Sequence, residues 1–263
     1  MQIPQHLNSP LMKKLLLAAA VMAAAVPSIS LSASVASDNA SAANYPGGTW
    51  TTGSNGGTGF GSWTLTSTPA GGFSGSFIGG TAVGNPAFGL YSGGNAAATA
   101  TARRPFTGGG LTAGQSFGVT IGNTPSINTG GQLGLSLMSG GTARWTLKFV
   151  GGGANWLLND GGSDFSSGQA YAANTSLALT FTYNGGNSYS YTFGTGSGNN
   201  FTAGVDISNL DGVQFFSVNQ GDDQNIGINN LSVVPEPSTY ALLGIAVLGF
   251  AAHLARRRRR ASH

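Results

Sequence analysis

The sequence predicts an all-β protein whose strands form a two-sheet antiparallel β-sandwich, with a jelly roll as the expected form. The main observation is a period of two: apolar and small residues alternate in many short runs, and turns rich in Gly, Asn and Ser separate these runs. A second observation is that no helical period of useful length occurs between residues 45 and 233. Glycine is abundant, at 44 of 263 residues, but it follows no Gly-X-Y period, which excludes collagen.

The clearest alternation predicts a β-hairpin. Residues 177–183 and 189–193 each place large apolar side chains at every second position, and an Asn/Gly cluster at 184–187 joins them. Trp145 alternates with Leu147 and Phe149, so we expect it in the core. The remaining predicted strands, in chain order, are 62–67, 73–78, 87–91, 116–121, 133–137, 145–149, 213–218 and 226–233.

The N-terminal segment has the three parts of a secretory signal peptide. Lys13 and Lys14 precede an apolar run at 15–26, and Pro27 and small residues follow it. We expect translation to begin at Met12 and the segment to enter the Sec export machinery as a helix.

Small residues offer two cleavage positions for this signal peptide. Cleavage after Ala36 would place Ser34 at the third position before the cleaved bond. Cleavage after Ala42 would place Ala40 there. With the first choice, residues 1–36 are the signal peptide, residues 37–44 a linker and residues 45–233 the β-sandwich domain.

The C-terminal segment, residues 234–263, has three ordered parts. A Pro-Glu-Pro motif at 235–237 leads into an apolar stretch at 239–255, which is slightly shorter than the ~20 residues that a spanning helix usually needs and at the lower limit of ~17. Basic residues directly after such a helix hold that end in the cytoplasm, and these are Arg256, Arg257, Arg258, Arg259 and Arg260. The prolines disfavour helix, so Pro235, Glu236 and Pro237 are expected to be extended and accessible outside the membrane.

These three parts resemble the PEP-CTERM sorting signal of Gram-negative bacteria. The resemblance implies that exosortase, a membrane-embedded cysteine transpeptidase, cleaves an inner-membrane-anchored precursor near residues 235–237. It also implies release or transfer of the protein to the cell surface, usually in organisms that produce exopolysaccharide. The chain would then be the substrate of the sorting enzyme.

The middle of the chain has a looser resemblance. It rests on the following segments, in this order: 87–91, 104–106, 115–117, 145–149, 219–221 and 229–231. Together they are similar to a β-sandwich module of PEP-CTERM proteins that is related in style to concanavalin-like lectin folds.

The residues of the central domain argue against an enzyme and against a nucleic-acid partner. Residues 45–233 contain no His, Cys or Glu, so a Ser-His-Asp triad or a His-ligated metal site cannot form in its usual way. The same residues include four Lys or Arg and six Asp, which gives a net charge of −2, and the basic residues form no stripe. We predict that the protein is not an enzyme and has no resident cofactor.

Calcium is the one inorganic ligand that the loops could suit, because it takes carboxylate and amide oxygens. The candidate ligands are Asp160 and Asp164 in one loop and Asp222 and Asp223 in another. An ordinary solvated turn is the alternative for each loop. Trp156 is the candidate for stacking on a sugar ring, with core packing as its alternative.

The sequence therefore predicts an exported protein of the cell surface or extracellular matrix, processed by exosortase. Its expected role is structural or adhesive within an exopolysaccharide-rich envelope or biofilm. The alternative function is a carbohydrate-binding, lectin-like module that holds extracellular polysaccharide by specific contacts.

Overall fold

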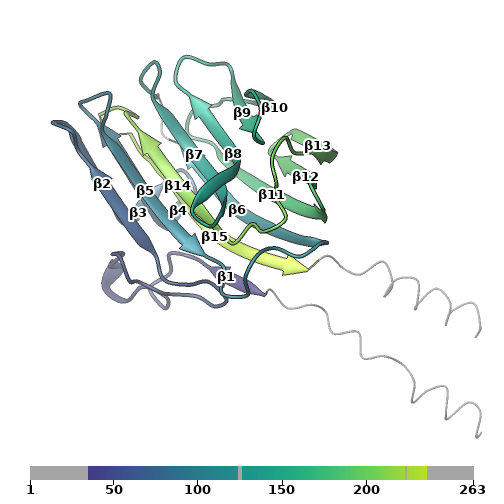
Figure 1. The fold of residues 1–263 in the computed structure, drawn as a ribbon. Helices are drawn as coiled ribbons and strands as arrows, with labels where there is room; N and C mark the ends of the chain where they lie inside the picture. Colours follow the sequence, from purple (N-terminus) through teal and green to yellow (C-terminus); the bar gives the residue numbers. More distant parts are fainter. Residues whose placement is uncertain (1–34, 124–125, 223, 236–263) are drawn as a thin grey trace, which may run out of the picture. The chain divides into compact units, whose positions relative to one another are not determined.

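The computed structural model describes residues 35–123, 126–222 and 224–235, and these residues form two antiparallel sheets (Figure 1). Within one compact unit, 32–236, the regular secondary structure of the described residues is strand, apart from a single 3-10 turn at Pro46–Gly48 (η2). The all-β prediction is confirmed. The expected signal-peptide helix (residues 1–36) and the expected transmembrane helix (residues 239–255) lie outside the described residues, except for Val35 and Ala36.

The first sheet joins strands from both ends of the domain. Its order is β13-β12-β11-β6-β15-β4-β3, and β1 pairs with β15 beside this path. The bounds are β13 Gly196–Thr202, β12 Ser188–Phe193, β11 Ser176–Gly185, β6 Gln115–Asn123, β15 Ile226–Pro235, β4 Gly84–Gly93, β3 Phe73–Thr81 and β1 Ala36–Asp38.

The second sheet has the order β10-β9-β8-β7-β14-β5-β2. The bounds are β10 Phe165–Ala170, β9 Asn155–Asn159, β8 Thr142–Val150, β7 Gln132–Ser139, β14 Gly212–Val218, β5 Thr99–Pro105 and β2 Thr64–Thr68. Every strand pair in both sheets is antiparallel, which is the arrangement that short turns between alternating strands favour.

Period-two alternation explains the core between the sheets. In β8, Trp145, Leu147 and Phe149 are buried on one face while their neighbours are partly exposed. The predicted hairpin is confirmed as β11 and β12, with Tyr183 opposite Tyr189. Trp145 packs edge-on against Phe181 of that hairpin, with ring centroids 5.0 Å apart, so it joins the two sheets in the core as expected.

The expected linker at 37–44 belongs instead to the folded domain. Ser37 and Asp38 lie in β1, which pairs with Leu231 and Ser232 of β15. Ala40 is buried, and its backbone N–H donates to the side chain of Asn229. The short strand was missed because three residues are too few to show an alternation.

Candidate functional site

Three aromatic side chains form a row on the outer face of the first sheet, at its β3–β4 edge. Phe73 and Phe77 lie on β3, and Tyr91 lies on β4 opposite Gly75. Residues 73, 75 and 77 share one face of the sheet, so all three rings lie on the same side. The Tyr91 ring is 6.3 Å from that of Phe73 and 6.2 Å from that of Phe77, with tilts of 33° and 40°.

The rings of this aromatic row lie over glycines of the neighbouring strand. A Cβ atom at Gly89 would overlap the ring of Phe77, so only glycine leaves space for this ring. Phe73 is 37% exposed, an unusual degree for a large apolar side chain, and Phe77 and Tyr91 are half-buried. The row is therefore a fixed aromatic surface in contact with solvent.

Amide side chains border the aromatic row. A depression of about 470 Å³ is lined by the three rings and by Gln224 and Asn225 from the β14–β15 connection. Gln224 is held in place, since its Nε2 donates to the carbonyl of Asp222 at 3.1 Å. The depression therefore combines apolar ring faces with hydrogen-bonding amides.

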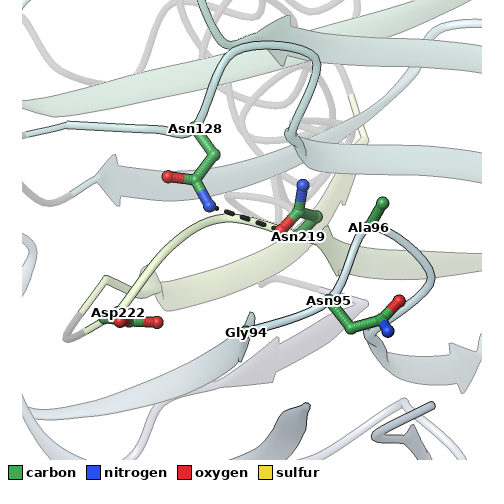
Figure 2. Close-up of a pocket in the computed structure, with 6 residues that line it drawn as sticks. All are labelled: Gly94, Asn95, Ala96, Asn128, Asn219 and Asp222. Carbon is green, nitrogen blue, oxygen red and sulfur yellow. Dashed lines mark hydrogen bonds between the residues drawn. The ribbon is translucent and has the colours of Figure 1, made fainter. Parts of the chain in front are cut away.

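A second, polar groove of about 580 Å³ lies along the same connection (Figure 2). Three loops line it: residues 94–96 after β4, Asn128 before β7, and Asn219 with Asp222 after β14. Asn128 Nδ2 donates to Asn219 Oδ1 at 3.3 Å, which ties two of these loops together. Asp222 and Gln224 are joined by the hydrogen bond between Gln224 Nε2 and the Asp222 carbonyl, so one short connection contributes residues to both the polar groove and the depression at the aromatic row.

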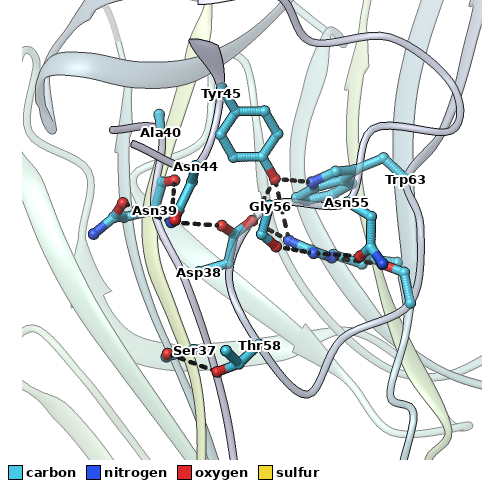
Figure 3. A network of polar contacts seen from close by, with 12 residues as sticks. Ser37, Asp38, Asn39, Ala40, Asn44, Tyr45, Asn55, Gly56, Thr58 and Trp63 are labelled. Atoms are coloured by element: carbon cyan, nitrogen blue, oxygen red, sulfur yellow. Dashed lines mark hydrogen bonds and ion pairs between the residues drawn. The ribbon is translucent and has the colours of Figure 1, made fainter. Parts of the chain in front are cut away.

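A buried charge network forms a separate feature near the N-terminal end of the domain (Figure 3). Arg104 of β5 and Asp38 of β1 form an ion pair, and both side chains are 0% exposed. The Arg104 guanidinium also lies 5.0 Å from the ring centroids of both Phe60 and Trp63. Its N–H groups donate to the carbonyls of Gly56 and Gly61, the side chain of Asn55, the carboxylate of Asp38 and the hydroxyl of Tyr45.

Tyr45 completes this network. Its hydroxyl donates to Asp38 Oδ2 at 2.7 Å and accepts from Trp63 Nε1 at 2.8 Å. Burial, together with the hydrogen bond to Asp38, raises the pKa of Tyr45 above its usual value. With its donors occupied by protein groups, Arg104 fixes the segment around β1 to the sandwich, and it offers no free donor to a ligand.

Trp156, the residue predicted to stack on sugar, lies in the core. It is 1% exposed, and its ring packs edge-on against Phe193 with centroids 5.0 Å apart. A sugar ring needs an accessible aromatic face, so Trp156 does not present a glycan surface in this structure. Core packing, the alternative, describes its position.

In the first candidate calcium loop, Asp160 and Asp164 contact different protein groups. Asp160 accepts a hydrogen bond of 2.9 Å from the buried Tyr189 hydroxyl, while Asp164 pairs with Lys148 at 2.7 Å. Partial burial raises the pKa of Asp164, but hydrogen bonds from Lys148 and Asn159 and the Lys148 charge outweigh it, so the pKa lies below its usual value.

The other candidate loop reaches the surface groove. Asp222 lines the polar groove, and Asp223 lies outside the described residues. In the part of the chain that the structure describes, no group of three or more His, Cys, Asp or Glu side chains is placed to hold a metal ion. Calcium binding by the Asp222–Asp223 loop stays a sequence prediction.

The sequence comparison finds its match at the C-terminal end. Residues 233–260 match the family model of the PEP-CTERM protein-sorting motif. The chain carries a PEP-CTERM sorting motif. The motif begins inside β15, where Val233 pairs with Phe117 and Pro235 pairs with Gln115, so no spacer separates the sheet from the motif.

The rest of the PEP-CTERM motif, including Glu236, Pro237, the apolar stretch 239–255 and the arginines at 256–260, lies outside the described residues. Among the residues that the structure describes, no helix has the length and apolar character to cross a membrane. A comparison with curated protein sequences gives no significant match.

Several solved β-structures are similar to this chain at low identity. Galectin LEC-6 from Caenorhabditis elegans is 14% identical, with a TM-score of 0.39 over 50% of this chain and 88% of the galectin. The receptor binding domain of botulinum neurotoxin D is 12% identical, with a TM-score of 0.43 over 72% of this chain, which spans 48% of that domain. The alginate lyase from Corynebacterium sp. is 11% identical, with a TM-score of 0.41 over 58% of this chain and 73% of the lyase.

Proposed function

We propose that this chain is an exported precursor that exosortase processes into a non-enzymatic protein of the cell surface or extracellular matrix. The observation that carries this proposal is the sorting motif, which starts within the last strand of a compact sandwich. The sorting motif directs the precursor to exosortase, and the folded domain is the part that reaches the cell surface. Its role is structural or adhesive in an exopolysaccharide-rich envelope or biofilm.

Substitutions in the sorting motif test this proposal. Glu236→Ala combined with Pro237→Ala should leave the C-terminal tail on the protein, because the extended segment that the sorting enzyme recognises is altered. The readout is the intact mass of the protein in membrane and extracellular fractions of the native host. The control is Asp206→Ala, an exposed change within the domain, which should leave processing complete.

Release of the doubly substituted protein with its tail removed would contradict the proposal. The proposal is supported if the wild type and the control both lose the tail and only the motif variant retains it.

A second function is favoured by the aromatic row: binding of a polysaccharide chain. Pyranose rings present C–H faces that pack on aromatic rings, and their hydroxyl groups need hydrogen-bonding partners. The row of Phe73, Tyr91 and Phe77 supplies successive ring faces, and Gln224 supplies an amide beside them. A linear glycan lying across β3 and β4 would use both, and adhesion to matrix polysaccharide would follow.

Replacing the middle ring tests this second function. Tyr91→Ala should weaken binding of the host's purified exopolysaccharide about tenfold, equal to about 1.4 kcal/mol, because stacking on one ring is lost. Calorimetric titration of the processed protein, with and without EDTA, measures the affinity and any calcium requirement. Phe165→Ala is the matched control, since it removes a half-buried aromatic ring from β10 in the other sheet.

Equal affinities for the wild type and Tyr91→Ala would contradict a binding site at the aromatic row. An equal loss in Phe165→Ala would likewise contradict it, because the effect would then not be local.

A further inference from the structure

The segment before Tyr45 is an integral part of the domain. Ala36 to Asp38 form β1, which pairs residue by residue with Val233 to Leu231 of β15 (Figure 1). The ladder continues at Val35, whose N–H donates to the carbonyl of Val233 at 2.8 Å. On the other side, Ser37 exchanges two backbone hydrogen bonds with Thr58, at 2.9 and 2.8 Å. Strand β1 is therefore bonded along both of its edges.

Close packing also holds this segment in place. A Cβ atom at Gly59 would overlap the carbonyl oxygen of Val35, so the two backbones touch. Ala36 and Ala40 are each 1% exposed and belong to the hydrophobic core. A chain beginning at residue 37 would lose the contacts of Val35 and Ala36, and a chain beginning at residue 43 would lose those of Ala40 as well.

Among the residues of this segment, Asp38 contributes most to the stability of the domain, because its carboxylate pairs with a fully buried arginine. Within the described residues its carboxylate is the one that pairs with Arg104, and the Tyr45 hydroxyl donates to it as well (Figure 3). A buried arginine without its carboxylate is strongly destabilising. The mature domain therefore needs Asp38.

We infer that the leader is removed on the N-terminal side of Val35, rather than after Ala36 or Ala42. This inference rests on the proposed export. Small residues two apart, the pattern that a leader peptidase accepts, occur upstream within 28–34 as Ser28-Ile-Ser30, Ser30-Leu-Ser32 and Ser32-Ala-Ser34. Cleavage there adds one water across one peptide bond, leaving a carboxylate on the leader and a free amine on the mature chain. The complete β1 strand then stays in the domain.

The N-terminal residue of the mature protein, purified from its native host and identified by mass spectrometry, tests this inference. The expected first residue lies between Leu31 and Val35. A mature chain that begins at Ser37 or Ala43 would overturn the inference while leaving export intact. A chain that keeps its leader would overturn the export proposal, and this inference with it.

A substitution provides an independent test. Asp38→Ala should lower the melting temperature of the mature protein by at least about 6 °C, because Arg104 loses its buried partner. Asp206→Ala, at an exposed position, is the control and should lower the melting temperature by a few degrees at most, because the hydrogen bond that it removes, from the Ser208 N–H, is exposed to solvent. If the leader were cut after Ala42, Asp38 would be absent from the mature protein and the Asp38→Ala variant would melt like the wild type. That result would overturn the inference.

Discussion

Arg104→Met is expected to lower the free energy of unfolding by about 3–5 kcal/mol, the usual cost of breaking a buried ion pair on one side. The substitution leaves the Asp38 carboxylate buried without its cation, and it leaves the carbonyls of Gly56 and Gly61 without a donor. The substitution is destabilising because these polar groups stay buried without partners. Urea unfolding of the mature protein, followed by tryptophan fluorescence, measures the loss.

The exposed ion pair between Lys148 and Asp164 provides the matched control. Its side chains are 19% and 34% exposed, so Lys148→Met should cost less than about 1 kcal/mol. In addition, Asp38→Leu combined with Arg104→Met should cost less than the sum of the two single changes, because no charge is left unpaired. If Arg104→Met and Lys148→Met lowered the free energy of unfolding equally, the buried charge network would not stabilise the domain as described.

Trp156→Ala is expected to cost about 3–5 kcal/mol of unfolding free energy, the range for truncating a large core aromatic side chain. The ring is 1% exposed and packs against Phe193 and Phe149, so its removal leaves a cavity between the sheets. Polysaccharide affinity of the folded variant should not change. Thermal unfolding and calorimetric titration of the same sample measure the two effects separately.

Phe73→Ala is the comparison for this prediction. Phe73 is 37% exposed, so the cost in stability should stay below about 1 kcal/mol while polysaccharide affinity falls. The opposite pattern, a stable Trp156→Ala variant that no longer binds, would show that Trp156 and not the aromatic row contacts the glycan.

Most of the fold could be predicted because alternation reports directly on a half-buried strand. It identified β8, β11, β12 and β15, where large apolar residues mark the inner face. It missed β5, whose inner face consists of Ala100, Ala102 and Arg104, because alanine gives little contrast with its threonine neighbours and arginine is a polar residue. Strands β10 and β13 were also missed, because each contains one large apolar residue, Phe165 or Phe201, and so shows no alternation.

The sites were harder to predict, because they depend on contacts between distant residues. Asp38 and Arg104 are 66 positions apart, and nothing near either residue in the sequence indicates a partner. The aromatic row had a local signal that was not used: Phe73 and Phe77 share a strand face, and Tyr91 lies among glycines. By contrast, the sorting motif could be identified completely, because its order of residues is itself the signal.

The most direct test of the central claim is the intact mass of the protein from its native host, with and without exosortase. We predict that the wild-type protein lacks the apolar stretch and the arginines that follow residue 237, and that the strain without exosortase retains them in the membrane fraction. Retention of the complete C-terminal segment in both strains would contradict the claim, and the segment would then be an anchor for a membrane-tethered β-domain.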